Sequence, residues 1–84
     1  MRVGVQFTGS LSAGQSNRWF TYNWPANWHV VWYVVPISPK TGAPQIQWDV
    51  AVERASSDYI TYWITVKNIS SETVNFEARY AVLN

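Results

Sequence analysis

Hydrophobic and polar residues alternate along the C-terminal half of the chain with a period of two. Three segments carry this alternation, residues 45–53, 59–67 and 73–82, and short polar stretches separate them. This period is typical of β-strands that bury one face, so we predict an antiparallel meander of three strands with one solvated face. The positions predicted to face inward are Ile46, Trp48, Val50 and Val52, then Ile60, Tyr62, Ile64 and Val66, then Val74, Phe76, Ala78, Tyr80 and Val82.

The N-terminal half is also rich in strand-forming residues, but its pattern is less regular. Residues 9–14 (GSLSAG) predict a turn, and two strands are expected over 17–24 and 28–35. The segment 28–35 is apolar on both faces, which is typical of a strand that is covered on both sides. A strand before the turn is predicted from alternating residues expected to share one face, namely Val3, Val5 and Phe7.

Six short predicted strands and no helical apolar stripe favour an all-β fold. The chain has 84 residues, and a chain this short cannot bury two separate cores, so we expect one domain over residues 1–84. The predicted architecture is a small antiparallel β-sandwich of about six strands, and a partly closed β-barrel is the alternative. The chain is 48% hydrophobic and 13% charged, which excludes an intrinsically disordered protein.

Composition also narrows the chemistry that the chain can support. It has no cysteine, which excludes disulfides, a thiol nucleophile and cysteine-based metal sites. His29 is the single histidine, so no cofactor and no histidine-cluster metal site are expected. Six Lys and Arg residues against five Asp and Glu give a net charge of +1, which argues against nucleic-acid binding.

The sequence contains no obvious membrane or targeting segment. No window approaches the 18 or so consecutive apolar residues of a membrane-spanning helix, so no membrane span is expected. Residues 1–6 (MRVGVQ) do not resemble a signal peptide, because they lack an apolar core region. The chain is then expected to be either cytoplasmic or, if it is a module of a longer secreted protein, extracellular.

The segment from Ile60 to Leu83 (ITYWITVKNISSETVNFEARYAVL) resembles the last hairpin of bacterial immunoglobulin-like accessory modules. That hairpin consists of an alternating strand, an Asn-rich turn, here near Lys67-Asn68, and a second alternating strand. The resemblance covers roughly a quarter of the chain and includes no catalytic motif. It implies a β-sandwich that acts as a spacer, a docking unit or a carbohydrate binder beside a secreted or surface enzyme.

The aromatic residues of segment 17–35 exceed what a small sandwich can bury. A two-layer sandwich covers one face of each strand, so the surplus rings are expected to contact a second subunit, a ligand or a neighbouring domain. A candidate ligand-binding or interface cluster in this segment combines Arg18, Trp19, Tyr22, Asn23, Trp24, Asn27, Trp28, His29 and Trp32. The alternative is that most of these rings are core or interface anchors, and that His29 is a structural hydrogen-bonding residue.

A second candidate site is predicted on the outer face of the meander. If three residues connect the first two strands and five connect the last two, Trp63 lies between Asp49 and Arg79, and Thr65 lies between Gln47 and Glu77. An exposed indole flanked by these polar groups suits a sugar, which stacks its apolar face on the ring. The alternative is a structural cation–π pair of Arg79 with Trp63 and an ion pair with Asp49.

These observations favour a non-catalytic carbohydrate-binding or lectin-like module. The alternative is a structural β-sandwich that forms a homo-oligomer, or docks a parent protein, through its Trp-rich strands. An enzyme is not expected, because glycoside hydrolysis needs two carboxyl groups about 5–9.5 Å apart. Asp49 and Glu53 lie roughly 13 Å apart on one strand, at about 3.3 Å per residue.

Overall fold

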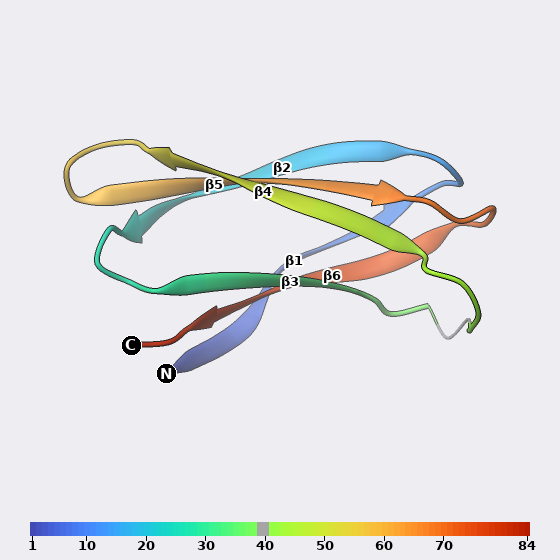
Figure 1. The fold of residues 1–84 in the computed structure, drawn as a ribbon, viewed down its shortest axis with the longest axis horizontal. Helices are drawn as coiled ribbons and strands as arrows, with labels where there is room; N and C mark the ends of the chain where they lie inside the picture. Colours follow the sequence, from blue (N-terminus) through green and yellow to red (C-terminus); the bar gives the residue numbers. More distant parts are fainter. Residues whose placement is uncertain (39–40) are drawn as a thin grey trace.

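The computed structural model describes residues 1–38 and 41–84, and the described residues form six β-strands and no helix. The strands make two three-stranded antiparallel sheets, with the orders β1-β6-β3 (sheet A) and β2-β5-β4 (sheet B), stacked in two layers (Figure 1). This arrangement confirms the predicted all-β sandwich and shows no closed barrel. The strands are β1 (Arg2–Leu11), β2 (Ser16–Pro25), β3 (Val30–Pro36), β4 (Ile46–Arg54), β5 (Tyr59–Asn68) and β6 (Val74–Val82).

The chain changes sheet at every connection except the β4–β5 hairpin. The predicted meander is therefore wrong for its third strand, because β6 lies in sheet A between β1 and β3. At the end of β5, the fully buried Asn68 side chain bonds both β1 and the β5–β6 connection, and these contacts stabilise the crossing to sheet A. Its amide nitrogen donates to Leu11 O (3.0 Å) and Glu72 O (2.6 Å), and its oxygen accepts from Ser70 N (2.9 Å) and Ser70 Oγ (2.7 Å).

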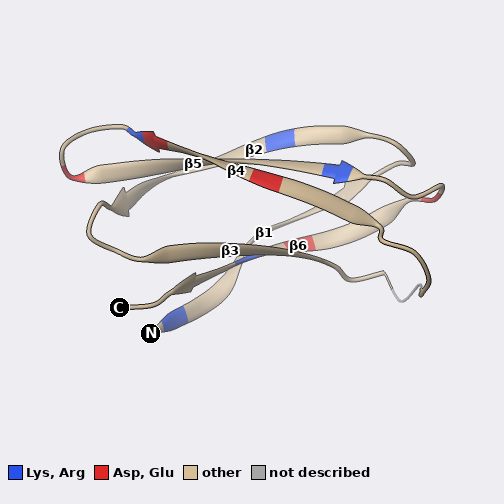
Figure 2. Ribbon diagram, in the orientation of Figure 1, with Lys and Arg blue, Asp and Glu red and all other residues tan. Residues whose placement is uncertain are grey.

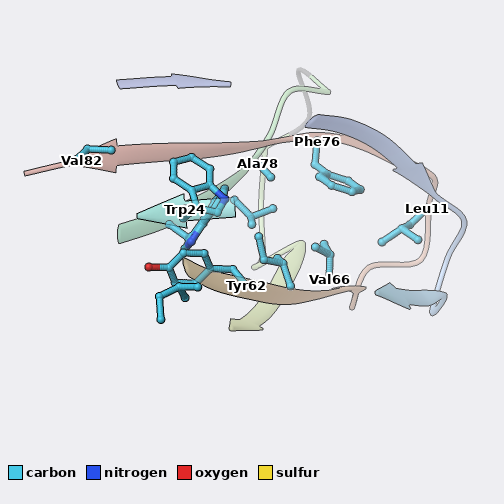
Figure 3. Close-up of a cluster of buried hydrophobic side chains, with 11 residues drawn as sticks. Leu11, Trp24, Tyr62, Val66, Phe76, Ala78 and Val82 are labelled. Atoms are coloured by element: carbon cyan, nitrogen blue, oxygen red, sulfur yellow. The ribbon is translucent and has the colours of Figure 1, made fainter. Parts of the chain in front are cut away.

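The core lies between the two sheets, and side chains from both point toward one another (Figure 3). The predicted inward positions of β5 and β6 are confirmed, with Tyr80 only partly buried. The predicted inward residues of β4 are more exposed because β4 is an edge strand, and Val52 is 64% exposed. Burial raises the pKa of the Tyr62 hydroxyl above its ordinary value of 10.0, because the interior disfavours the charged phenolate.

Strand β1 continues through part of the segment predicted to be a turn. It extends to Leu11, which is 1% exposed and belongs to the core, so the predicted turn over 9–14 is too long. Gly9 lies inside the strand, where it faces the buried ring of Phe76. The glycine marks a close contact rather than a change of chain direction.

Each of the edge strands β1 and β2 contains a β-bulge. In β1, Val5 pairs with Arg79 and Phe7 with Ala78, so Gln6 is the extra residue. The bulge reverses the alternation, and Val3 and Val5 do not share the inward face of Phe7 but are exposed. This corrects the single face predicted for these three residues.

The bulge in β2 lies between Thr21 and Trp24, which pair with Tyr62 and Ile60. Asn23, inside this bulge, has a φ of 64°, a left-handed conformation that asparagine tolerates better than most residues. The two bulges are joined across the sheets, because Gln6 Nε2 donates a hydrogen bond to Thr21 Oγ1 at 3.1 Å.

Both chain ends lie at the same end of the sandwich (Figure 1), where Arg2 pairs with Val82. Among the described residues, basic and acidic positions are distributed over strands of both sheets (Figure 2). Over residues 1–38 and 41–84, no helix is long and apolar enough to cross a membrane.

Candidate functional site

The predicted row that combines Trp63 with Arg79 does not form. Trp63 belongs to β5 in sheet B, whereas Glu77 and Arg79 belong to β6 in sheet A, so their side chains point to opposite sides of the sandwich. The predicted register of the β4–β5 hairpin is also wrong, since Asp49 pairs with Thr65 and Ala51 with Trp63. Five residues, not three, separate the last pair of the hairpin, Arg54 and Ile60.

Trp63 does lie on the outer face of sheet B, but its ring is largely occupied by neighbours. The Arg18 guanidinium stacks over it at 4.6 Å, and the Phe20 ring lies at 5.1 Å. Trp63 Nε1 donates a hydrogen bond to Glu53 Oε1 at 2.7 Å. A cation–π pair therefore exists on Trp63, with Arg18 in place of Arg79, which instead forms an ion pair with Glu77 at 2.7 Å.

Gln47 and Asp49 come together elsewhere on the outer face of sheet B. They line a shallow hollow of about 300 Å³, together with Ser16, Trp48, Thr65 and Lys67. The hollow holds an acid and a base, but Trp63 does not line it. It therefore lacks the stacking ring on which the predicted sugar site depended.

The predicted cluster of segment 17–35 is divided among different environments. Trp24 and Trp32 are buried, and Trp19 and Trp28 pack partly buried against the core. Asn27 and His29 lie in the exposed β2–β3 turn, where their backbones bond the side chain of Asn84. Of the predicted cluster, Tyr22, Asn23, Trp24 and Trp28 line one groove together.

This groove, which we call the edge groove, opens where the bulged strands β1 and β2 lie beside each other. Its volume is about 530 Å³, within the range of roughly 300–1,000 Å³ that small-molecule sites span. The two bulges set its shape, because each adds a residue to one of these strands. It is lined by Arg2, Gln6, Thr21, Tyr22, Asn23, Trp24, Pro25, Trp28, Tyr59 and Tyr80.

Aromatic rings make up half of the groove lining. Trp24 forms its buried base and meets Trp28 and Tyr80 edge to face, at 6.2 and 5.2 Å between ring centroids. Tyr22 and Tyr59 are more accessible, with 63% and 45% of their surfaces exposed. The Trp24, Trp28 and Tyr80 rings are held in place by packing in or against the core, so their contacts with a ligand cost little side-chain entropy.

Polar groups with free hydrogen-bonding capacity accompany these rings. Thr21 Oγ1 is occupied, because it accepts from Gln6 Nε2 and from Trp24 Nε1 at 3.0 Å. Within the described residues, the Asn23 amide and the hydroxyls of Tyr22 and Tyr59 have no hydrogen-bond partner. Asn23 also carries the positive φ, a strained conformation of the kind that clusters at functional sites.

Besides Thr21 and Pro25, which lie beside the predicted cluster in β2, sequence reasoning missed four residues of the groove, Arg2, Gln6, Tyr59 and Tyr80. They come from strands β1, β5 and β6, which the sequence separates widely from Tyr22. No local pattern links these strands, and strict alternation cannot reveal the bulges that bring them together. Asn23 offers a weak signal in the sequence, because asparagine is enriched at left-handed positions.

The outer face of sheet A carries a second exposed surface, which is apolar. Val3 and Val31 flank Ala81 from the two edge strands, and Val5 and Tyr33 flank Arg79 in the adjacent row. The small Ala81 side chain leaves a hollow of about 410 Å³ between the flanking residues. The β1 bulge creates this surface, since it turns both valines of β1 outward.

Neither surface contains the elements of a metal centre. In the part of the chain that the structure describes, no three histidine or carboxylate side chains are grouped so that they can hold a metal ion. Comparison with protein-family models, with curated proteins and with solved structures gives no match.

Proposed function

We propose that the protein is a non-catalytic carbohydrate-binding module and that the edge groove is its binding site. The observation that carries this proposal is the convergence, in one groove of about 530 Å³, of packed aromatic rings with free amide and hydroxyl groups. A sugar presents the complementary surface, because its ring has an apolar face of C–H groups and an edge of hydroxyls. The Tyr22 and Tyr59 rings suit the apolar face of the sugar, and the Asn23 amide suits its hydroxyls.

Replacing Tyr22 with alanine is expected to weaken glycan binding at least about tenfold, because this removes an exposed ring from the groove wall. The free energy of unfolding is expected to change by no more than about 0.5 kcal/mol, since Tyr22 is an exposed residue. The measurement is a glycan array followed by calorimetric titration of the strongest ligand. Tyr33→Ala is the matched control, because Tyr33 is similarly exposed, at 54%, but lies on sheet A outside the groove.

Asn23→Gly is a second groove variant that separates chemistry from backbone strain. Glycine adopts the positive φ of this position without steric strain, so the variant removes the amide side chain and keeps the backbone conformation. Weaker binding by both Tyr22→Ala and Asn23→Gly supports the site. Affinities equal to that of Tyr33→Ala in both variants would rule out the edge groove as the glycan site.

A second candidate function, self-association, is favoured by the outer face of sheet A. The exposed valines and Tyr33 form an apolar surface whose charged residues, Glu77 and Arg79, neutralise each other. We propose a second copy of this chain as the partner of this face.

Val31→Lys is expected to shift a self-associating protein to the monomer, because it places a charge in the apolar hollow of sheet A. The measurement is the solution mass by light scattering on a sizing column across a hundredfold range of concentration. Val52→Lys is the control, since Val52 is also an exposed valine, at 64% against 48% for Val31, but lies on β4 in sheet B. A wild-type protein that is monomeric throughout this range would exclude the interface.

A further inference from the structure

We propose that the edge groove selects saccharides that carry a carboxylate, such as hexuronates, and that Arg2 is the residue that binds this group. The proposal rests on the proposed function and names the class of sugar. Among the described residues that line the groove, Arg2 is the single charged one, and none is an aspartate or a glutamate.

The five carboxylates of the chain all lie elsewhere in the fold. Asp58 lines a neighbouring hollow that shares Pro25 and Tyr59 with the groove, but it does not line the groove itself. Asp49 and Glu53 lie on β4, Glu72 lies in the β5–β6 connection, and Glu77 is paired with Arg79 on the outer face of sheet A. The charge of Arg2 is therefore not neutralised by an acid in the groove.

The position of Arg2 leaves its hydrogen-bond donors available. Its guanidinium carbon lies over the Trp28 ring, 4.5 Å from the ring centroid, which is a cation–π contact. The N–H groups lie along the edge of the guanidinium, and among the described residues none of them has a hydrogen-bond or ion-pair partner. A planar fork of this kind binds a carboxylate through two parallel hydrogen bonds.

Stacking on Trp28 also orients Arg2 before a ligand binds. Less side-chain entropy is lost when an arginine that already packs on a ring forms its polar contacts. The remaining lining then serves the sugar ring, with Tyr22 and Tyr59 for its apolar face and Asn23 for its hydroxyls. An acidic sugar satisfies both parts of the groove, whereas a neutral sugar leaves the guanidinium without a charged partner.

The test compares acidic oligosaccharides with forms from which only the charge has been removed. Oligomers of polygalacturonate, alginate and hyaluronan are titrated beside their methyl esters, and beside neutral cello- and xylo-oligosaccharides. At least one acid is expected to bind about tenfold or more tightly than its own ester, because a charge-assisted bidentate pair is lost in the ester. Affinity for the acid is expected to fall between 20 and 200 mM salt.

Two arginine variants show whether Arg2 is responsible. Arg2→Gln is expected to reduce the affinity for the acid to that of the ester, and to leave the affinity for the ester unchanged. Arg18→Gln is the matched control, because Arg18 also stacks on a tryptophan, at 4.6 Å from the Trp63 centroid, but lies outside the groove. The control is expected to bind every sugar as the wild type does.

The outcomes separate this inference from the proposed function. Equal affinity for acids and esters, or binding of neutral sugars alone, would overturn the selection for carboxylates and leave carbohydrate binding intact. Equal or tighter binding of dextran sulfate, with the same loss in Arg2→Gln, would assign the groove to sulfate instead. Binding of no sugar in any of the three groups would overturn both proposals.

Discussion

Asn68→Leu is expected to lower the free energy of unfolding by about 2–4 kcal/mol, because each buried polar group left without a partner costs about 1–3 kcal/mol. The native Asn68 side chain is fully buried and uses both its donors and its acceptor. Leucine has a similar volume but no polar atoms. Leu11 O would then lose the Asn68 amide that donates to it, and Ser70 N would lose the Asn68 oxygen that accepts from it.

The measurement is urea unfolding followed by tryptophan fluorescence. Asn17→Ala is the matched control, because Asn17 is exposed and its side-chain oxygen accepts one local hydrogen bond, from Arg18 N. That variant is expected to stay within about 0.5–1 kcal/mol of the wild type. If Asn68→Leu proved as stable as Asn17→Ala, the Asn68 hydrogen bonds would not stabilise the connection from β5 in sheet B to β6 in sheet A.

Gly9→Ala is the second change with a large expected effect, a loss of about 1–3 kcal/mol from overpacking. A Cβ atom at this position would lie 2.6 Å from Cζ and 2.9 Å from Cε1 of Phe76. The Phe76 ring has little freedom to move away, because it is fully buried and meets Trp19 edge-on at 5.3 Å. In an unstrained position, the same substitution would stabilise a protein by about 0.4–1 kcal/mol.

A double-mutant cycle shows whether the Phe76 ring causes the loss. In the background of Phe76→Leu the ring is absent, so adding Gly9→Ala is expected to cost clearly less than it does in the wild type. Ser10→Ala, at the neighbouring exposed position of β1, controls for the general effect of alanine in this strand. An equal cost of Gly9→Ala in both backgrounds would show that the close contact does not determine the need for glycine.

The alternation of residues was sufficient to predict the strands and most of their inward faces. Ile64 and Val66 of β5 and Phe76 and Ala78 of β6 are buried as predicted. Each such prediction depends on residues two apart in one strand, and the geometry of a strand places those residues on the same face. The prediction failed at Val3 and Val5, where a bulge interrupts the regular geometry.

The candidate site was predictable only in part. Tyr22, Asn23, Trp24 and Trp28 belong to the edge groove, and the aromatic and amide composition of their segment indicated a binding surface. The site predicted around Trp63 failed for two reasons. Its cross-strand pairs depended on an assumed turn length, and a change of two residues in the β4–β5 turn moved every pair.

The sequence alone therefore predicts the local part of the structure. This part comprises six strands, an apolar face for most of them and an excess of aromatic residues. The tertiary structure alone decided which sheet each strand joins and where the edge groove lies. The physical reason is the range of the interactions involved. Asn68 bonds Leu11 from 57 residues away, and Gln6 bonds Thr21 across the two sheets, so neither contact exists until the sandwich has formed.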